Sequence, residues 1–172
     1  RMCGLDVHEI TPREIDDLMV YDGEAQVCLR GYPSMGDRLI LGSGWSKTYA
    51  MTGWRIGFAL APAPIITAMT KLQSHSTSNP TSIAQKGAVE AMKGPQSSIP
   101  TMLAEYRRRR DFVIGRLRQI DGVSIVTPKG AFYAYPNISV AYRSGKIKSS
   151  LDFAGQLLAN AHVAVVPGEA FG

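Results

Sequence analysis

The chain has 172 residues, of which 45% are hydrophobic and 19% charged, and its formal net charge is +5 at pH 7. Seven tyrosines, five phenylalanines and two tryptophans argue against disorder, and no apolar run reaches the roughly 18 residues that a membrane helix needs. We therefore expect a soluble, cytoplasmic protein that forms one core, or one domain and part of another.

The densest positive charge is a run of four arginines at residues 107–110. Successive residues of a helix point about 100° apart, so these arginines surround the helix instead of forming one basic stripe. This arrangement disfavours a nucleic-acid-binding function. Cys3 and Cys28 lack a metal-ligand or CxxC spacing, and we expect two reduced thiols.

Hydrophobic periodicity and turn residues predict the first elements of the chain. Residues 11–23 are expected to form a short helix or strand that ends at Asp22-Gly23. Residues 37–44 and 54–62 are predicted to be two buried strands, the first ending in Gly44 and the second in Pro62.

Helical spacing follows in residues 65–73, and residues 78–94 predict a helix capped by Ser78 or Asn79 and stopped by Gly94. A longer helix is expected from Ile99 to Ile120, and a capped helix at 149–161. Between and after these, residues 122–139 predict two strands around a Pro-Lys-Gly turn, and residues 162–172 a short buried strand and a turn. The apolar positions expected to face inward are Met102, Tyr106, Val113, Leu117 and Ile120 on the long helix and Leu151, Phe153, Leu157 and Leu158 on the last one.

Lys47 lies between the two predicted strands, where a rigid scaffold can present a reactive group. The sequence has no carboxylate between Asp37 and Glu90, so the local sequence offers this lysine no ion-pair partner. A lysine amine is ordinarily protonated at neutral pH, and it becomes a useful nucleophile when its surroundings favour the neutral form or when it is held as a Schiff base.

Arg55 follows in the same segment, and a guanidinium fork matches a phosphate group well. Ser43, Ser46 and Thr48 add hydroxyl donors, and several glycines allow a ligand to approach the backbone. A lysine beside a phosphate cradle suggests pyridoxal phosphate. The alternative is an exposed lysine next to a strand, with a solvated arginine.

The segment SKTYAMTGWRIG, residues 46–57, resembles the lysine signature of fold-type I aminotransferases of class I/II, in particular the prokaryotic aspartate- and aromatic-type subgroup. Further resemblances follow in the family's order and cover nearly the whole chain from about Glu14 onward. They are VYDGEAQ (20–26), STSNPTSIAQ (76–85), RRRRDFVIGRL (107–117), PKGAFYAYPNIS (128–139) and VVPGEAFG (165–172).

By this resemblance Lys47 carries the Schiff base with pyridoxal phosphate, Arg55 grips the cofactor phosphate, and Ser46 lends it a hydroxyl. Relatives often have a phosphate-binding serine where this chain has Gly44. The implied fold is α/β: part of a large domain with a mixed sheet flanked by helices, and an α+β small domain. The implied division is residues 1–96 for the end of the large domain, 97–121 for a connecting helix and 122–172 for part of the small domain.

The implied function is amino transfer between an amino acid and a 2-oxo acid, in a homodimer without nucleic-acid or membrane partners. Another pyridoxal phosphate reaction, such as C–S bond cleavage or decarboxylation, or a non-catalytic module of the same fold, is the alternative. Ser74 stands where aspartate-specific relatives often have an arginine, which disfavours a dicarboxylate substrate. The sequence does not choose among aspartate, aromatic and branched-chain donors.

Several residues depart from the family pattern or carry no predicted chemistry. In an ungapped alignment Arg13 and Asp16 occupy the places of an aspartate that pairs with the pyridine nitrogen and of a tyrosine that bonds the cofactor's 3′-oxygen. The glycine-rich helix start, stacked ring and asparagine of the family's first half have no counterpart, so we expect these 172 residues to be inactive alone. Phe132 or Tyr133 is expected only to pack, and His8, His75 and His162 lack metal-ligand spacing, so no metal site is predicted.

Overall fold

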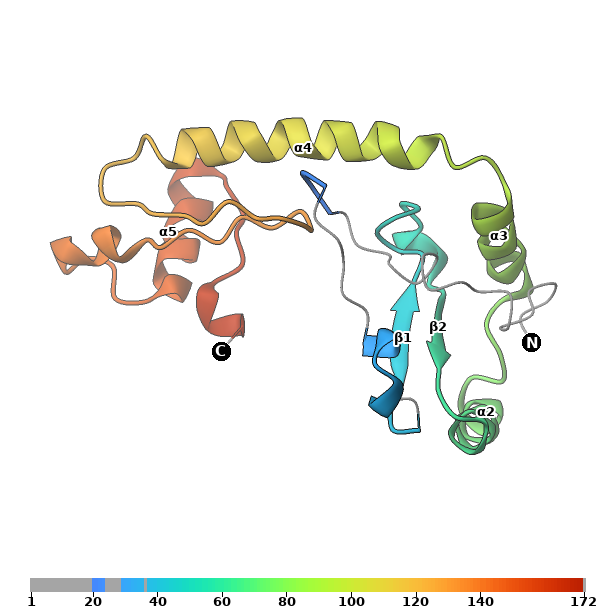
Figure 1. Ribbon diagram of the computed structural model, residues 1–172. Helices are drawn as coiled ribbons and strands as arrows, with labels where there is room; N and C mark the ends of the chain where they lie inside the picture. The colour runs from blue at the N-terminus through green and yellow to red at the C-terminus, as the bar shows by residue number, and fades with distance from the viewer. Residues whose placement is uncertain (1–19, 24–28, 36, 172) are drawn as a thin grey trace. The chain divides into compact units, whose positions relative to one another are not determined.

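The lysine segment joins two short antiparallel strands. The structure, a computed structural model, describes residues 20–23, 29–35 and 37–171. The strands are β1 (Leu41–Gly44) and β2 (Gly57–Leu60), which lie side by side in Figure 1. Leu41 lies opposite Leu60, and Gly44 lies opposite Gly57. The two predicted strands are thus confirmed, although each is shorter than expected. The prediction that they are buried is wrong, because every residue in them is partly or largely exposed.

Four α-helices follow within the described residues, and 3-10 helices separate several of the elements. The α-helices are α2 (Ala63–Ser76), α3 (Ser82–Lys93), α4 (Ser98–Leu117) and α5 (Ser150–Ala161). The 3-10 helices are η2 (Leu29–Gly31), η3 (Pro33–Met35), η4 (Thr52–Trp54), η5 (Ser139–Ser144) and η6 (Gly168–Phe171). All four predicted helices are therefore confirmed. None of the described helices is both long and apolar enough to cross a membrane.

The predicted start of α3 is wrong, whereas its end is right. The residue before the helix is Thr81, and neither its side chain nor those of Ser78 and Asn79 caps the first turn. Asn79 instead donates to the carbonyl of Pro80 at 2.8 Å. Gly94 follows the last turn and donates its N–H to the carbonyl of Glu90 at 2.7 Å, as the sequence predicted.

The start of α5 follows the expected capping pattern. The Ser149 hydroxyl accepts a hydrogen bond from the N–H of Asp152 at 3.0 Å. The Asp152 carboxylate in turn accepts from the N–H of Lys148 at 3.1 Å. Two otherwise unpaired backbone donors are satisfied, and a negative charge lies in the first turn, where the helix dipole favours it.

The described residues fall into two units, and α4 runs from one into the other. The first unit ends at Arg107 and also includes Lys129–Phe132, while the second contains Arg108–Pro128 and the residues from Tyr133 onward. The core of the first unit is formed by Trp45, Met51 and Ile56 from the strand connection together with Ala84 and Ala88 from α3.

The helix faces predicted to be buried are partly wrong. On α4 the buried side chain is Ile114 at 3% exposure, whereas Val113 is 40% exposed. On α5 the buried residue is Ala154, and Leu151 and Leu158 are exposed. The periodicity located the helices but misplaced their buried faces, because the covering elements decide which side of an apolar helix is buried.

The strands predicted in residues 122–139 and 162–172 do not form ladders. Ser124 and Asn137 make one isolated antiparallel bridge, with N–H to carbonyl distances of 3.4 and 2.8 Å. Of the segment 11–23, only residues 20–23 are described, and there Val20 bridges Gly130.

In the second unit the Glu169 carboxylate binds Ser150, the first residue of α5. This carboxylate accepts hydrogen bonds from the N–H of Ser150, at 3.0 Å, and from the Ser150 hydroxyl. The hydroxyl bond is the main cause that lowers the pKa of Glu169 from its usual value of 4.5. Because this pKa is lower in the folded state, the ionised Glu169 carboxylate stabilises the fold at pH values above its usual pKa. This contribution is lost as the pH falls through the pKa of the folded state.

We predict that Ser150→Ala raises the pKa of Glu169 toward its usual value, because the largest cause of the shift is removed. NMR titration of the glutamate side-chain carboxyl carbons measures the change. Ser139→Ala, an exposed serine of the same unit, serves as control and should leave the midpoint of Glu169 where it is. Equal midpoints in the Ser150→Ala and unmodified chains would contradict the assignment.

Candidate functional site

The connection between β1 and β2 is held by buried side chains at both of its ends and near its middle. Trp45 is 1% exposed, Met51 7% and Ile56 5%. The Trp45 ring also packs edge-on against Phe58 of β2, with centroids 5.1 Å apart. Because these apolar side chains point into the core, the polar residues beside them in the sequence are directed away from it.

Lys47 lies in the turn that follows β1, and its side chain is exposed. The carbonyl of Trp45 accepts from the N–H groups of Tyr49, at 3.3 Å, and Met51, at 3.4 Å, which closes this turn. The Lys47 ammonium lies over the ring of Phe132, 5.1 Å from its centroid. The sequence identified the lysine but not this ring, which it assigned to packing alone.

Arg55 lies at the other end of the connection and has left-handed backbone angles, φ 53° and ψ 46°. This conformation costs a residue with a side chain about 1 kcal/mol, so the surroundings must hold it. The Arg55 guanidinium donates to the carbonyl of Thr52 at 3.2 Å. A guanidinium has five N–H donors, and this bond uses one of them, so the group can also bind an anion.

Thr52 links the two ends of the segment. Its hydroxyl donates to the carbonyl of Ser46 at 2.8 Å, and its own carbonyl accepts from Arg55. Ser46 is partly buried next to Trp45. The three predicted site residues, Ser46, Lys47 and Arg55, therefore lie on one closed connection that Thr52 ties together.

The strands approach closely at Gly44 and Gly57, where they enter the connection. A Cβ at residue 44 would lie 3.1 Å from the carbonyl oxygen of Ile56, and one at Gly57 would lie 2.9 Å from that of Ser43. A side chain at residue 57 would displace the backbone of β1, whereas one at residue 44 would require the neighbouring backbone to shift by a few tenths of an ångström.

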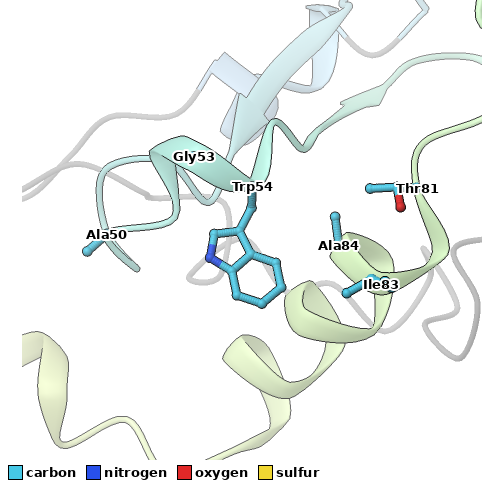
Figure 2. A pocket seen from close by; sticks show the side chains of 6 residues that line it. All are labelled: Ala50, Gly53, Trp54, Thr81, Ile83 and Ala84. Carbon is cyan, nitrogen blue, oxygen red and sulfur yellow. The ribbon is translucent and has the colours of Figure 1, made fainter.

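Helix α3 packs against the connection through small residues. A Cβ on Gly87 would lie 2.6 Å from the ring of Trp54, and Ala84 and Ala88 are buried beside it. A cavity of about 580 Å³ opens here, and Figure 2 shows the Trp54 indole on the side of the connection that faces α3. Its lining consists of Ala50, Gly53, Trp54, Thr81, Ile83 and Ala84.

This cavity is not the predicted site. Its lining includes neither Lys47 nor Arg55, and its one side-chain hydroxyl belongs to Thr81. Walls without an ionisable group cannot supply an amine or neutralise a phosphate. Within the part of the chain that the structure describes, no group of three or more His, Cys, Asp or Glu residues could hold a metal ion. Arg13, Asp16, Cys3, Cys28 and His8 lie outside the described residues.

Three comparisons identify the family. Residues 18–172 match the family model for aminotransferase class I and II. The chain is 42% identical over 164 residues to an aspartate aminotransferase of Geobacillus stearothermophilus, covering 95% of this chain and 42% of the relative. It is 47% identical over 145 residues to an aspartate/prephenate aminotransferase of Cereibacter sphaeroides, covering 81% of this chain and 36% of the relative.

Solved structures agree with the sequence relatives. The aspartate aminotransferase of Rhizobium meliloti matches with a TM-score of 0.80 and 41% identity, over 90% of this chain and 40% of its own. The aromatic aminotransferase of Pyrococcus horikoshii matches with a TM-score of 0.81 and 40% identity, over the same shares. The chain thus spans well under half the length of these relatives.

The protein belongs to the aminotransferase class I and II family, and its fold is part of the fold-type I architecture that the resemblance implied. Members of this family use pyridoxal phosphate. The residues on the connection suit that cofactor chemically, since Lys47 offers an amine for its aldehyde and Arg55 a guanidinium for its phosphate.

We predict that Thr52→Val lowers the free energy of unfolding by about 1 kcal/mol, because it removes the hydroxyl bond to Ser46 at nearly constant volume. Urea unfolding followed by tryptophan fluorescence measures this, since both tryptophans, Trp45 and Trp54, lie on the connection. The matched control is Thr70→Val in α2, where the hydroxyl bonds the carbonyl of Ile66 within one helix, and we expect a change under about 0.5 kcal/mol. Equal losses in both variants would show that Thr52 has no special role.

Proposed function

We propose that this chain carries the cofactor-binding lysine and arginine of a pyridoxal phosphate enzyme, and that the complete protein transfers amino groups between an amino acid and a 2-oxo acid. The observation that carries the proposal is the closed connection that holds Lys47 and Arg55 between paired strands. Relatives named as aspartate, aspartate/prephenate and aromatic aminotransferases support an amino acid as donor.

Binding depends on the two cations and the hydroxyl beside them. Lys47 holds the cofactor covalently through its aldehyde, and Arg55 holds its phosphate. Ser46, next to the lysine, adds a hydroxyl donor to the phosphate. The segment between Asp37 and Glu90 contains no carboxylate, so the local sequence places no anion in competition with the phosphate.

The chemistry divides between the cofactor and the lysine. When bound, pyridoxal phosphate supplies a ring that accepts electrons from the carbon carrying the substrate amino group. Lys47, once the substrate amine has replaced it, would accept a proton at Nζ from the substrate carbon that bears the amino group and would donate it to the former aldehyde carbon of the cofactor. Its unbranched stem lets one amine both hold the cofactor and move the proton.

The residues of this chain do not select a particular substrate side chain. Ser74, which stands where aspartate-specific relatives often have an arginine, donates its hydroxyl to the carbonyl of Lys71 at 2.7 Å within α2. The division into residues 1–96, 97–121 and 122–172, the homodimer and the cytoplasmic location stay predictions.

We predict that incubation with pyridoxal phosphate followed by borohydride attaches the cofactor to Lys47, located by peptide mass mapping. Lys47→Ala should abolish this product, whereas Lys71→Ala, an exposed lysine of α2, should not. Arg55→Gln should weaken cofactor binding about ten- to hundredfold, because a charged hydrogen-bond donor to the phosphate is lost.

The control for the arginine is Arg38→Gln. Arg38 is exposed and also donates one bond, at 3.2 Å, to a nearby backbone carbonyl, that of Ser34. It lies before β1 and not on the connection. Label spread evenly over several lysines, or equal losses in the two arginine variants, would contradict the proposed cofactor site.

We predict that the complete protein moves isotopically labelled amino nitrogen from an amino acid into 2-oxoglutarate, giving labelled glutamate. Lys47→Ala should reduce this rate by about a thousandfold or more, because the amine that moves the proton is absent. The isolated 172 residues should be inactive or nearly so, and robust turnover by them would contradict that part.

The products separate amino transfer from its alternatives. Release of ammonia with a 2-oxo acid would instead indicate elimination, and release of carbon dioxide would indicate decarboxylation. Attachment of the cofactor to Lys47 without turnover by the complete protein would favour a non-catalytic module.

A further inference from the structure

Phe132 covers the amine on which the proposed function depends. The Lys47 Nζ lies 5.1 Å from the centroid of the Phe132 ring, within the roughly 6 Å over which a cation is attracted to a ring face. The two residues are far apart in the sequence, but both belong to the first unit. Movement of the amine away from the ring therefore gives up this contact.

The loop that carries this ring is held by a buried tyrosine. Tyr21 is 1% exposed, and its N–H donates to the carbonyl of Lys129 at 2.8 Å. Its hydroxyl donates to the carbonyl of Ala131 at 2.7 Å. Two polar groups of one buried residue thus bind the backbone just before Phe132.

The backbone at Ala131 needs such support. Its φ is 58°, a left-handed conformation that is unfavourable for a residue with a side chain. The Tyr21 hydroxyl bond falls on the carbonyl of this same residue. Tyr106 of α4 adds a ring contact to Phe132, with centroids 6.1 Å apart. The direction of the Phe132 side chain is therefore set by contacts from two other segments.

We propose that Phe132 is a positioning residue for Lys47: its ring holds the lysine ammonium when the amine is not bonded to another group, and Tyr21 fixes the ring in place. The consequence for catalysis rests on the proposed role of Lys47 in holding the cofactor and moving the proton. The contact with the ring restricts the positions that the exposed Lys47 side chain adopts. It also slows the reaction of the Lys47 amine with other groups.

The test methylates the lysines of the cofactor-free chain with isotope-labelled formaldehyde and cyanoborohydride and observes the methyl groups by NMR. The Lys47 signal, identified by its loss in Lys47→Arg, should be shifted upfield by the ring current. Phe132→Leu should remove this shift and speed methylation of Lys47 relative to Lys71 by about two- to fivefold. Tyr21→Phe should change both in the same direction but by less.

Two sets of variants separate the ring's attraction from a general structural role. Phe132→Tyr and Phe132→Trp keep an aromatic face and should keep the shift and the slow methylation. Phe112→Leu, at an exposed phenylalanine of α4, should leave both unchanged. Loss of the shift in the Tyr and Trp variants, or its survival in the Leu variant, would overturn the proposal.

Should Phe132→Leu fail to fold, phenylalanines carrying one to three ring fluorines at position 132 provide the same test at nearly constant size. Methylation of Lys47 should speed up with each fluorine, because fluorine weakens the attraction of the ring face, and a flat series would overturn the proposal. A flat series with the cofactor still trapped on Lys47 overturns this inference alone. A graded series without trapping supports the ring contact and overturns the proposed cofactor role.

Discussion

The burial of Trp45 and Ile56 at the two ends of one chain connection is the constraint on which the site depends. Trp45 directly follows Gly44, and Ile56 directly precedes its strand partner Gly57. Both side chains therefore lie in one core with Met51 and α3. Burying side chains of this size stabilises by about 1.5–3 kcal/mol each. That exceeds the cost of a strained turn, so Lys47 and Arg55 can be held at the surface.

Small residues make this arrangement possible at three contacts. Gly44 and Gly57 let the strands approach, and Gly87 lets α3 lie against Trp54. Thr52 then closes the segment with bonds to Ser46 and Arg55. A larger side chain at any of the glycines would displace backbone or a ring, and the displacement would fall on the segment that carries the amine.

The site also depends on a segment distant in sequence. Residues 129–132 group with the first unit although the residues on both sides belong to the second, and Tyr21 binds that segment through backbone and hydroxyl. The chain belongs to the class I and II aminotransferases, and the proposed function assigns Lys47 and Arg55 to the cofactor. Within this segment Tyr21 bonds the backbone of Lys129 and Ala131, and the ring of Phe132 lies under the Lys47 ammonium.

The sequence by itself determined the family, the two strands around Lys47, the four helices and the Ser149 cap, because these rest on local periodicity, capping residues and one long motif. It could not determine that α3 starts at Ser82, that Ile114 is the residue buried on α4, or that residues 122–139 make isolated bridges instead of a ladder. Nor could it place Phe132 over Lys47. Only the tertiary structure decided these, because burial and long-range contact depend on which segments pack together, and spacing along the chain does not contain that information.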